Sequence, residues 1–137
     1  MFLDRINDRQ KQSFLALATR MMMADGEVAP EEEALLNDRK AAMGGEIVAP
    51  AAEIFGATNS EVIDTREARV FVTFELLVLM VSDDSVHIDE SSVLDEICSA
   101  LEISDDDRAT LQDLAVRANQ NPDDGAVKDG VEALAGG

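Results

Sequence analysis

Residues 14–44 read FLALATRMMMADGEVAPEEEALLNDRKAAMG, and this stretch decides the fold because the chain repeats its pattern. At an offset of 58 residues it falls on residues 72–102, VTFELLVLMVSDDSVHIDESSVLDEICSALE. Both stretches show an apolar helix, an aspartate, a short polar step, an acidic helix start and an amphipathic helix. The sequence therefore predicts two pseudo-symmetric helix-hairpin repeats, at about 10–44 and about 68–102.

Apolar residues recur with helical spacing along most of the chain, so we expect one compact all-α domain that spans residues 1–137. The expected helices cover residues 9–24, 30–43, 50–56, 66–82, 89–102 and 105–118. The apolar 66–82 helix should be the central one. Residues 120–137 are expected to be weakly ordered, as a weak terminal helix or a frayed tail.

The composition is strongly acidic, with 29 acidic and 11 basic residues and a formal net charge of -18. The field of such a chain repels nucleic acid and attracts cations and basic partners. The charge is uneven, because residues 1–24 hold four basic and two acidic side chains. There is no glycine-rich phosphate loop and no basic stripe. The sequence thus indicates a basic protein partner and argues against nucleic-acid binding.

The chain is expected to be soluble and cytoplasmic. Charges interrupt the N-terminal segment from Asp4 to Lys11, so no signal peptide is expected. The longest apolar run, Val70–Val81, is too short to span a membrane and contains Glu75. Cys98 is the only cysteine, which excludes a disulfide within the chain, and its apolar helical surroundings predict a buried thiol.

The motif MADGEVAPEEEALL, with its weaker echo VSDDSVHIDESSVL, resembles the TerB-like domain of tellurite-resistance proteins, a fold shared with the N-terminal domain of DjlA co-chaperones. The resemblance covers about residues 10–118. It implies an all-helical domain of about seven helices, linked to tellurite and stress resistance and to membrane-associated protein complexes. A location at the inner membrane through partners would follow.

The resemblance also implies a metal site at the acidic helix corners. Its candidate ligands are Asp25 and Glu32 in the first repeat and Asp83 and Glu90 in the second. Glu27 and Glu31 flank the first corner and rank second. Such oxygen ligands suit Ca²⁺ or Mg²⁺ better than Zn²⁺. The second repeat departs from the motif, because Asp84 and Ser85 replace Gly26 and Glu27, so equal occupancy of both corners does not follow.

Helix capping explains the same corner without a metal. Gly26 can end one helix, Pro30 suits the first position of the next, and Glu32 then meets that helix's free backbone N–H groups. Capping alone and capping with a bound cation both stay open. An EF-hand is excluded, since a loop counted from Asp25 places Pro30 where glycine is needed and Leu36 where a bidentate glutamate is needed.

Other site chemistries find little support. One histidine, His87, and one cysteine cannot build the usual zinc site, and no third group orients them as a nucleophilic pair. The Met21–Met23 run has the spacing of core residues. The sequence therefore predicts a non-enzymatic acidic interaction module that binds a basic or membrane-associated protein, with or without a divalent cation. The alternatives are a carboxylate-ligated metal-dependent hydrolase and a structural homodimerisation domain.

Overall fold

The computed structural model is all-helical over the residues that it describes. These are residues 2, 5–23, 34, 37–38, 40–41, 51–54, 56, 58, 60–82, 88–121 and 123–136. The helices are α1 (Asp8–Met22), α3 (Ala51–Ile54), α4 (Arg66–Ser82), α5 (Ile88–Ala100), α6 (Asp105–Gln120) and α7 (Gly125–Gly136). The prediction of an all-α chain is confirmed for this part of the protein.

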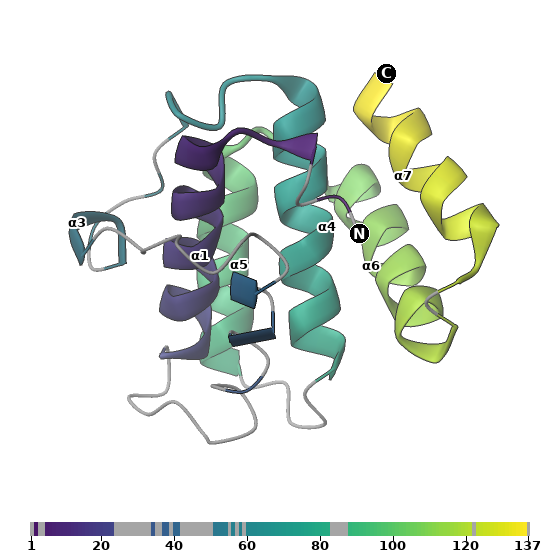
Figure 1. Ribbon diagram of the computed structural model, residues 1–137, viewed down its shortest axis with the longest axis horizontal. Helices are drawn as coiled ribbons and strands as arrows, with labels where there is room; N and C mark the ends of the chain where they lie inside the picture. Colours follow the sequence, from purple (N-terminus) through teal and green to yellow (C-terminus); the bar gives the residue numbers. More distant parts are fainter. Residues whose placement is uncertain are drawn as a thin grey trace.

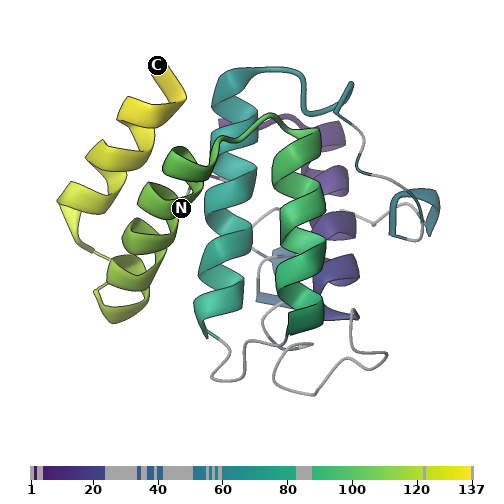
Figure 2. The same cartoon turned by 180° about the vertical axis from the view of Figure 1, so that it is seen from behind.

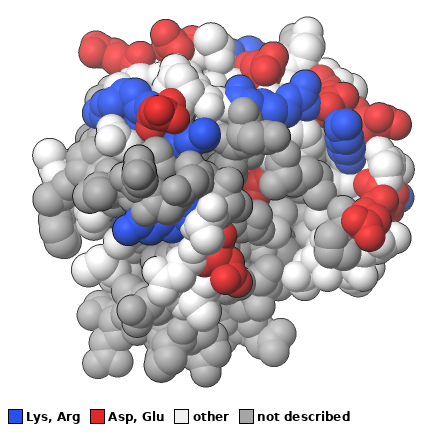
Figure 3. All heavy atoms as spheres, viewed as in Figure 1, with Lys and Arg blue, Asp and Glu red and all other residues white. Residues whose placement is uncertain are grey.

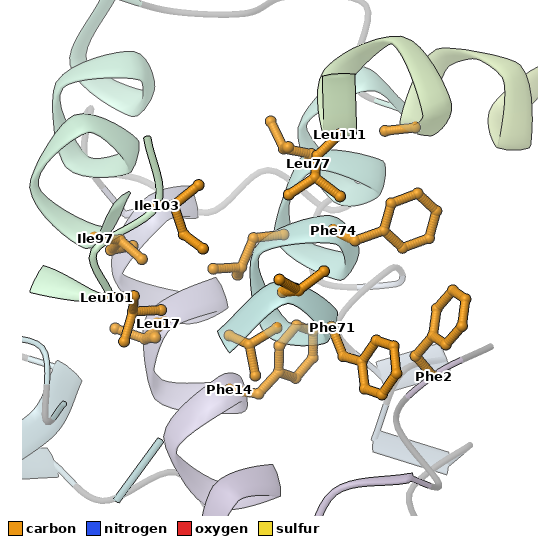
Figure 4. Packing of buried hydrophobic residues seen from close by; sticks show 14 of the residues in the cluster. Phe2, Phe14, Leu17, Phe71, Phe74, Leu77, Ile97, Leu101, Ile103 and Leu111 are labelled. Atoms are coloured by element: carbon orange, nitrogen blue, oxygen red, sulfur yellow. The ribbon is translucent and has the colours of Figure 1, made fainter. Parts of the chain in front are cut away.

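The central helix is α4, as the sequence predicts. Every residue from Val70 to Leu77 is buried, because neighbouring helices cover α4 on both sides. Helices α1 and α5 lie on one side of it, and the α6–α7 hairpin lies on the other (Figures 1 and 2). A hydrophobic core of leucine, valine, isoleucine and phenylalanine side chains joins these layers (Figure 4).

The described helix ends follow local chemistry. Helix α4 begins after Thr65, whose Oγ1 accepts a hydrogen bond from the Ala68 N–H at 3.1 Å. Helix α6 begins after Ser104, whose Oγ accepts from the Asp107 N–H at 3.2 Å. Both helices begin at the predicted residues, 66 and 105. Helix α1 has a capping box between Asn7 and Gln10 that the sequence analysis did not identify, although the N-x-x-Q spacing is a known signal.

Two turns show how the backbone limits the choice of residue. A Cβ on Gly56 would lie 2.4 Å from the carbonyl oxygen of Ala52, so the chain leaving α3 passes where only glycine fits. Glu102 adopts the left-handed conformation, with φ of 58°, at the end of α5. There the Ile103 N–H donates to the Cys98 carbonyl and the Glu102 N–H donates to the Ser99 carbonyl. This is a Schellman ending without the usual glycine.

Residues 125–136 form α7, whose Val127, Val131 and Ala135 are buried. The inner face of α6, formed by Leu111, Leu114, Ala115 and Ala118, is buried as well. The repeat and the count of seven helices stay predictions, because much of the stretch between α1 and α3 lies outside the described residues.

Candidate functional site

The two predicted metal corners follow the C-terminal ends of α1 and α4. These two ends and the beginning of α5 lie at the same end of the molecule (Figures 1 and 2). Five of the six candidate ligands, Asp25, Glu27, Glu31, Glu32 and Asp83, lie outside the described residues.

Glu90 belongs to the first turn of α5, and its side chain is not described. His87 also lies outside the described residues. Within the described ranges, no three His, Cys, Asp or Glu side chains are grouped so that they could hold a metal ion. The metal site therefore stays a prediction.

Ion pairs within the chain occupy many of the basic side chains. Among the described residues, seven basic side chains meet a carboxylate, and three of these pairs join two different helices. The pairs are Arg5–Glu132, Lys11–Asp8, Arg20–Glu96, Arg66–Asp107, Arg69–Glu102, Arg108–Asp95 and Arg117–Asp124. Because the chain has far more acidic than basic residues, this pairing leaves an excess of carboxylate on the surface.

That excess includes a set of exposed side chains on α6, the following turn and α7. Residues 105–136 contain eight acidic and three basic side chains. The exposed members that take part in none of the ion pairs above, here called the α6–α7 carboxylates, are Asp105, Asp106, Asp113, Asp123 and Asp129. Val116 is 40% exposed on the same helix as Asp113. In Figure 3, acidic and basic side chains are interleaved over the upper and right-hand parts of the face shown.

A second polar cluster lies where α1, α5 and the segment after α3 meet. The Arg20 guanidinium donates from Nε to the Ile54 carbonyl at 3.2 Å and from Nη1 to Thr58 Oγ1 at 3.1 Å. Nη1 also meets Glu96 Oε2 at 3.3 Å, and the Thr58 hydroxyl donates to that oxygen at 2.9 Å. Arg20 of α1 thus fastens Ile54 and Thr58 to α1 and, through Glu96, to α5. Sequence analysis missed it, since its partners are distant in the chain.

A cavity of about 560 Å³ opens between the end of α5 and the start of α6, lined by Cys98, Arg108, Asp95 and their neighbours. Cys98 is 4% exposed, so the prediction of a buried thiol is confirmed. Burial raises the pKa of the Cys98 thiol above its ordinary value, although the Arg108 guanidinium opposes this rise and the carboxylates of Asp95 and Asp105 add to it. The thiol therefore stays protonated at neutral pH and is a poor nucleophile.

Comparisons of the whole chain with protein-family models, curated proteins and solved structures find no match. The TerB-like resemblance thus stays a prediction based on the motif. Among the described residues, no helix is both long and apolar enough to cross a membrane.

Proposed function

We propose that the protein is a non-enzymatic interaction module that binds a basic protein segment through the α6–α7 carboxylates. The observation that carries this proposal is the distribution of charge. Arginines of α4 and α6 meet carboxylates of their own chain, whereas the α6–α7 carboxylates are exposed and take part in none of those pairs. A basic partner would meet several negative charges there, and its own positive charges would complement them.

Val116 supports the same surface. It is 40% exposed on α6, one turn from Asp113, and offers apolar contact area beside the carboxylates. Lysine and arginine have long aliphatic stems, which can cover such a residue while their charged ends reach the neighbouring carboxylates. A lysine-rich helix or extended segment is therefore the kind of partner that fits.

The TerB-like part of the proposal adds a divalent cation at the two acidic corners. Helices α1 and α4 begin 58 residues apart, at Asp8 and Arg66. Residues 34, 37–38 and 40–41 are helical, and 58 positions further on each falls within α5. This agreement, together with the shared end of the molecule at which α1 and α4 stop, supports two related corners that combine to bind a cation.

If a basic segment binds at the α6–α7 carboxylates, neutralising them should weaken its binding. The triple variant Asp113→Asn, Asp123→Asn and Asp129→Asn should bind a fluorescent lysine-rich peptide about tenfold more weakly than the wild type, since each exposed pair contributes up to about 1 kcal/mol. Fluorescence anisotropy measures the affinity. The affinity of the wild type should also fall as salt is added.

The matched control for that test changes net charge equally. The triple variant Asp38→Asn, Asp64→Asn and Glu67→Gln removes three exposed carboxylates from other parts of the described chain. It should keep most of the wild-type affinity. An equal loss in both triple variants would mean that only overall charge attracts the peptide, and would overturn the assignment of the surface to α6 and α7.

If a divalent cation binds at the two corners, calorimetric titration with Ca²⁺ or Mg²⁺ should give heat of binding. The bound ion should also raise the melting temperature, because a ligand of the folded state stabilises that state. The double variant Asp25→Asn and Asp83→Asn should remove both signals, whereas Asp64→Asn should leave them intact. Mn²⁺ and Zn²⁺ serve as comparison ions. If no ion gives heat or a thermal shift, the proposed cation site is wrong, and only the proposed binding of a basic segment remains.

A further inference from the structure

The N-terminal strap, defined as Phe2, Arg5 and Ile6, crosses from α4 to α7. Phe2 is 1% exposed, and its ring stacks on Phe71 with centroids 4.7 Å apart and meets the edge of Phe74 at 5.5 Å (Figure 4). Offset-stacked and edge-on ring pairs contribute beyond the area that they bury. The strap is therefore seated by an aromatic residue in a specific site, and not simply laid on the surface.

Two polar contacts fix the direction of the strap in this site. The Phe2 N–H donates to Oε1 of Glu75 at 3.0 Å, and Glu75 is 1% exposed in the buried middle of α4. Three residues later, Arg5 Nη1 meets Glu132 Oε1 of α7 at 2.5 Å. The Arg5 guanidinium also lies 5.1 Å from the Phe71 ring centroid. The surface thus recognises an aromatic ring, a backbone N–H and a cation in a fixed order.

We propose that the strap site, formed by Phe71, Phe74, Glu75 and Glu132, is a recognition site for a partner segment with an aromatic residue followed three positions later by arginine. The chain's own strap occupies this site as an autoinhibitory contact, and the partner segment displaces it. The strap itself is the template for the occupant, because it shows which chemistry each part of the site accepts.

The strap is suited to exchange because α1 does not depend on it. Helix α1 begins after Asn7, whose Oδ1 accepts from the Gln10 N–H while its own N–H donates to Gln10 Oε1, so this end is capped locally. The chain can therefore turn away at Asn7 without unwinding α1. The Arg5–Glu132 pair has side chains 41% and 35% exposed, so solvent screens it and it holds the strap only weakly.

The strap site is separate from the surface proposed above. Glu132 and Glu75 are not among the α6–α7 carboxylates, so the inference does not rest on docking at Asp113, Asp123 and Asp129. A peptide that binds at the strap site should bind the Asp113→Asn, Asp123→Asn and Asp129→Asn variant as it binds its parent. Failure of one proposal therefore leaves the other testable.

The test uses a fluorescent peptide with the sequence of residues 1–8, MFLDRIND, and full-length protein. The Phe2→Ala variant removes the ring from its own site and should bind the peptide at least about tenfold more tightly than the wild type, in which the tethered strap competes at high effective concentration. Peptides carrying Phe2→Ala or Arg5→Glu should lose this binding. Fluorescence anisotropy and a fold check by circular dichroism provide the measurements.

A second variant covers the case in which Phe2→Ala does not fold. Arg5→Glu keeps the buried ring and places a negative charge beside Glu132, so it should loosen the strap and increase peptide binding while the core stays intact. Ile97→Ala is the matched control for destabilisation, since Ile97 is fully buried in α5 and does not belong to the strap site. Peptide binding by Ile97→Ala equal to that of the strap variants would overturn the proposal.

Two further outcomes would also overturn it. If folded Arg5→Glu protein binds the peptide no better than the wild type does, the strap does not restrict access to the site. If the wild type forms a concentration-dependent dimer that the free peptide dissociates, the strap is exchanged between copies of this chain, and the site is not autoinhibited for another partner. Sedimentation velocity at several protein concentrations distinguishes this case.

Discussion

Replacing Leu77 by alanine is expected to lower the free energy of unfolding by about 2–5 kcal/mol, the usual cost of a leucine-sized cavity in a packed core. Leu77 is fully buried on the central helix, and Figure 4 shows it with Leu111 where α4 and α6 meet. Because α4 packs on both layers, relaxation around the cavity is restricted. Typical domains have only about 5–15 kcal/mol in total, so the loss is a large part of the stability.

Urea unfolding followed by circular dichroism measures this loss as a shift of the midpoint at unchanged slope. Val116→Ala is the control, because it removes apolar atoms from a side chain that is 40% exposed on α6. It should change the stability by less than about 0.5 kcal/mol. A Leu77→Ala protein as stable as the Val116→Ala protein would contradict the central position of α4.

Replacing Arg20 by alanine is the second change with a large expected effect, about 2 kcal/mol of stability. Its side chain is only 14% exposed and donates to the Ile54 carbonyl and the Thr58 hydroxyl. Without the guanidinium, the Ile54 carbonyl and the Thr58 hydroxyl lose a hydrogen-bond donor in a partly buried place. This lowers the stability more than the loss of a solvent-exposed pair would. The effect is kept modest because Glu96 is 47% exposed and can be hydrated.

Arg20→Lys should recover little of the loss, because an ammonium group cannot reproduce the fork that reaches Ile54, Thr58 and Glu96 together. Hydrogen exchange should show faster opening around residues 54–58 in both variants. Arg117→Ala is the control, since that arginine is 53% exposed in its pair with Asp124 and should cost less than about 1 kcal/mol. Equal effects at the two arginines would show that Arg20 does not fasten the segment.

Helix positions could be predicted because their signals are local. The periodic apolar pattern places α4, and the caps at Thr65 and Ser104 mark the starts of α4 and α6. The predicted start of α1, residue 9, differs by one position from the observed Asp8 because the capping box went unnoticed. Such boundary shifts are small, since each cap acts only on the first turn.

The tertiary contacts could not be predicted in the same way. Arg20 joins residues 34 and 76 positions away, and nothing in its neighbourhood specifies those partners. The strap was missed because the segment containing Phe2 and Arg5 has too few residues for a periodic pattern. Glu75 was identified only as an interruption of an apolar run, whereas in the structure it accepts a hydrogen bond from the strap.

The candidate sites also differ in whether the sequence alone or the structure identifies them. The acidic character follows from composition alone, but the α6–α7 carboxylates could be identified only from the structure, because it shows which carboxylates are exposed and which form the ion pairs described. The corners at Asp25 and Glu32, and at Asp83 and Glu90, depend on motif spacing. That spacing allows both a capped turn and a cation site, and only binding measurements separate the two.

The strap also determines the order in which the fold can be completed on the ribosome. The strap is synthesised before the described helices, but Arg5 must wait for Glu132, which follows it by 127 positions. Helices α1, α4 and α5 can associate before α7 has emerged, whereas the contact of Arg5 with Glu132 needs α7 and forms later. During translation the aromatic side chain of Phe2 is therefore accessible to chaperones and other partners until α4 supplies its ring partners Phe71 and Phe74.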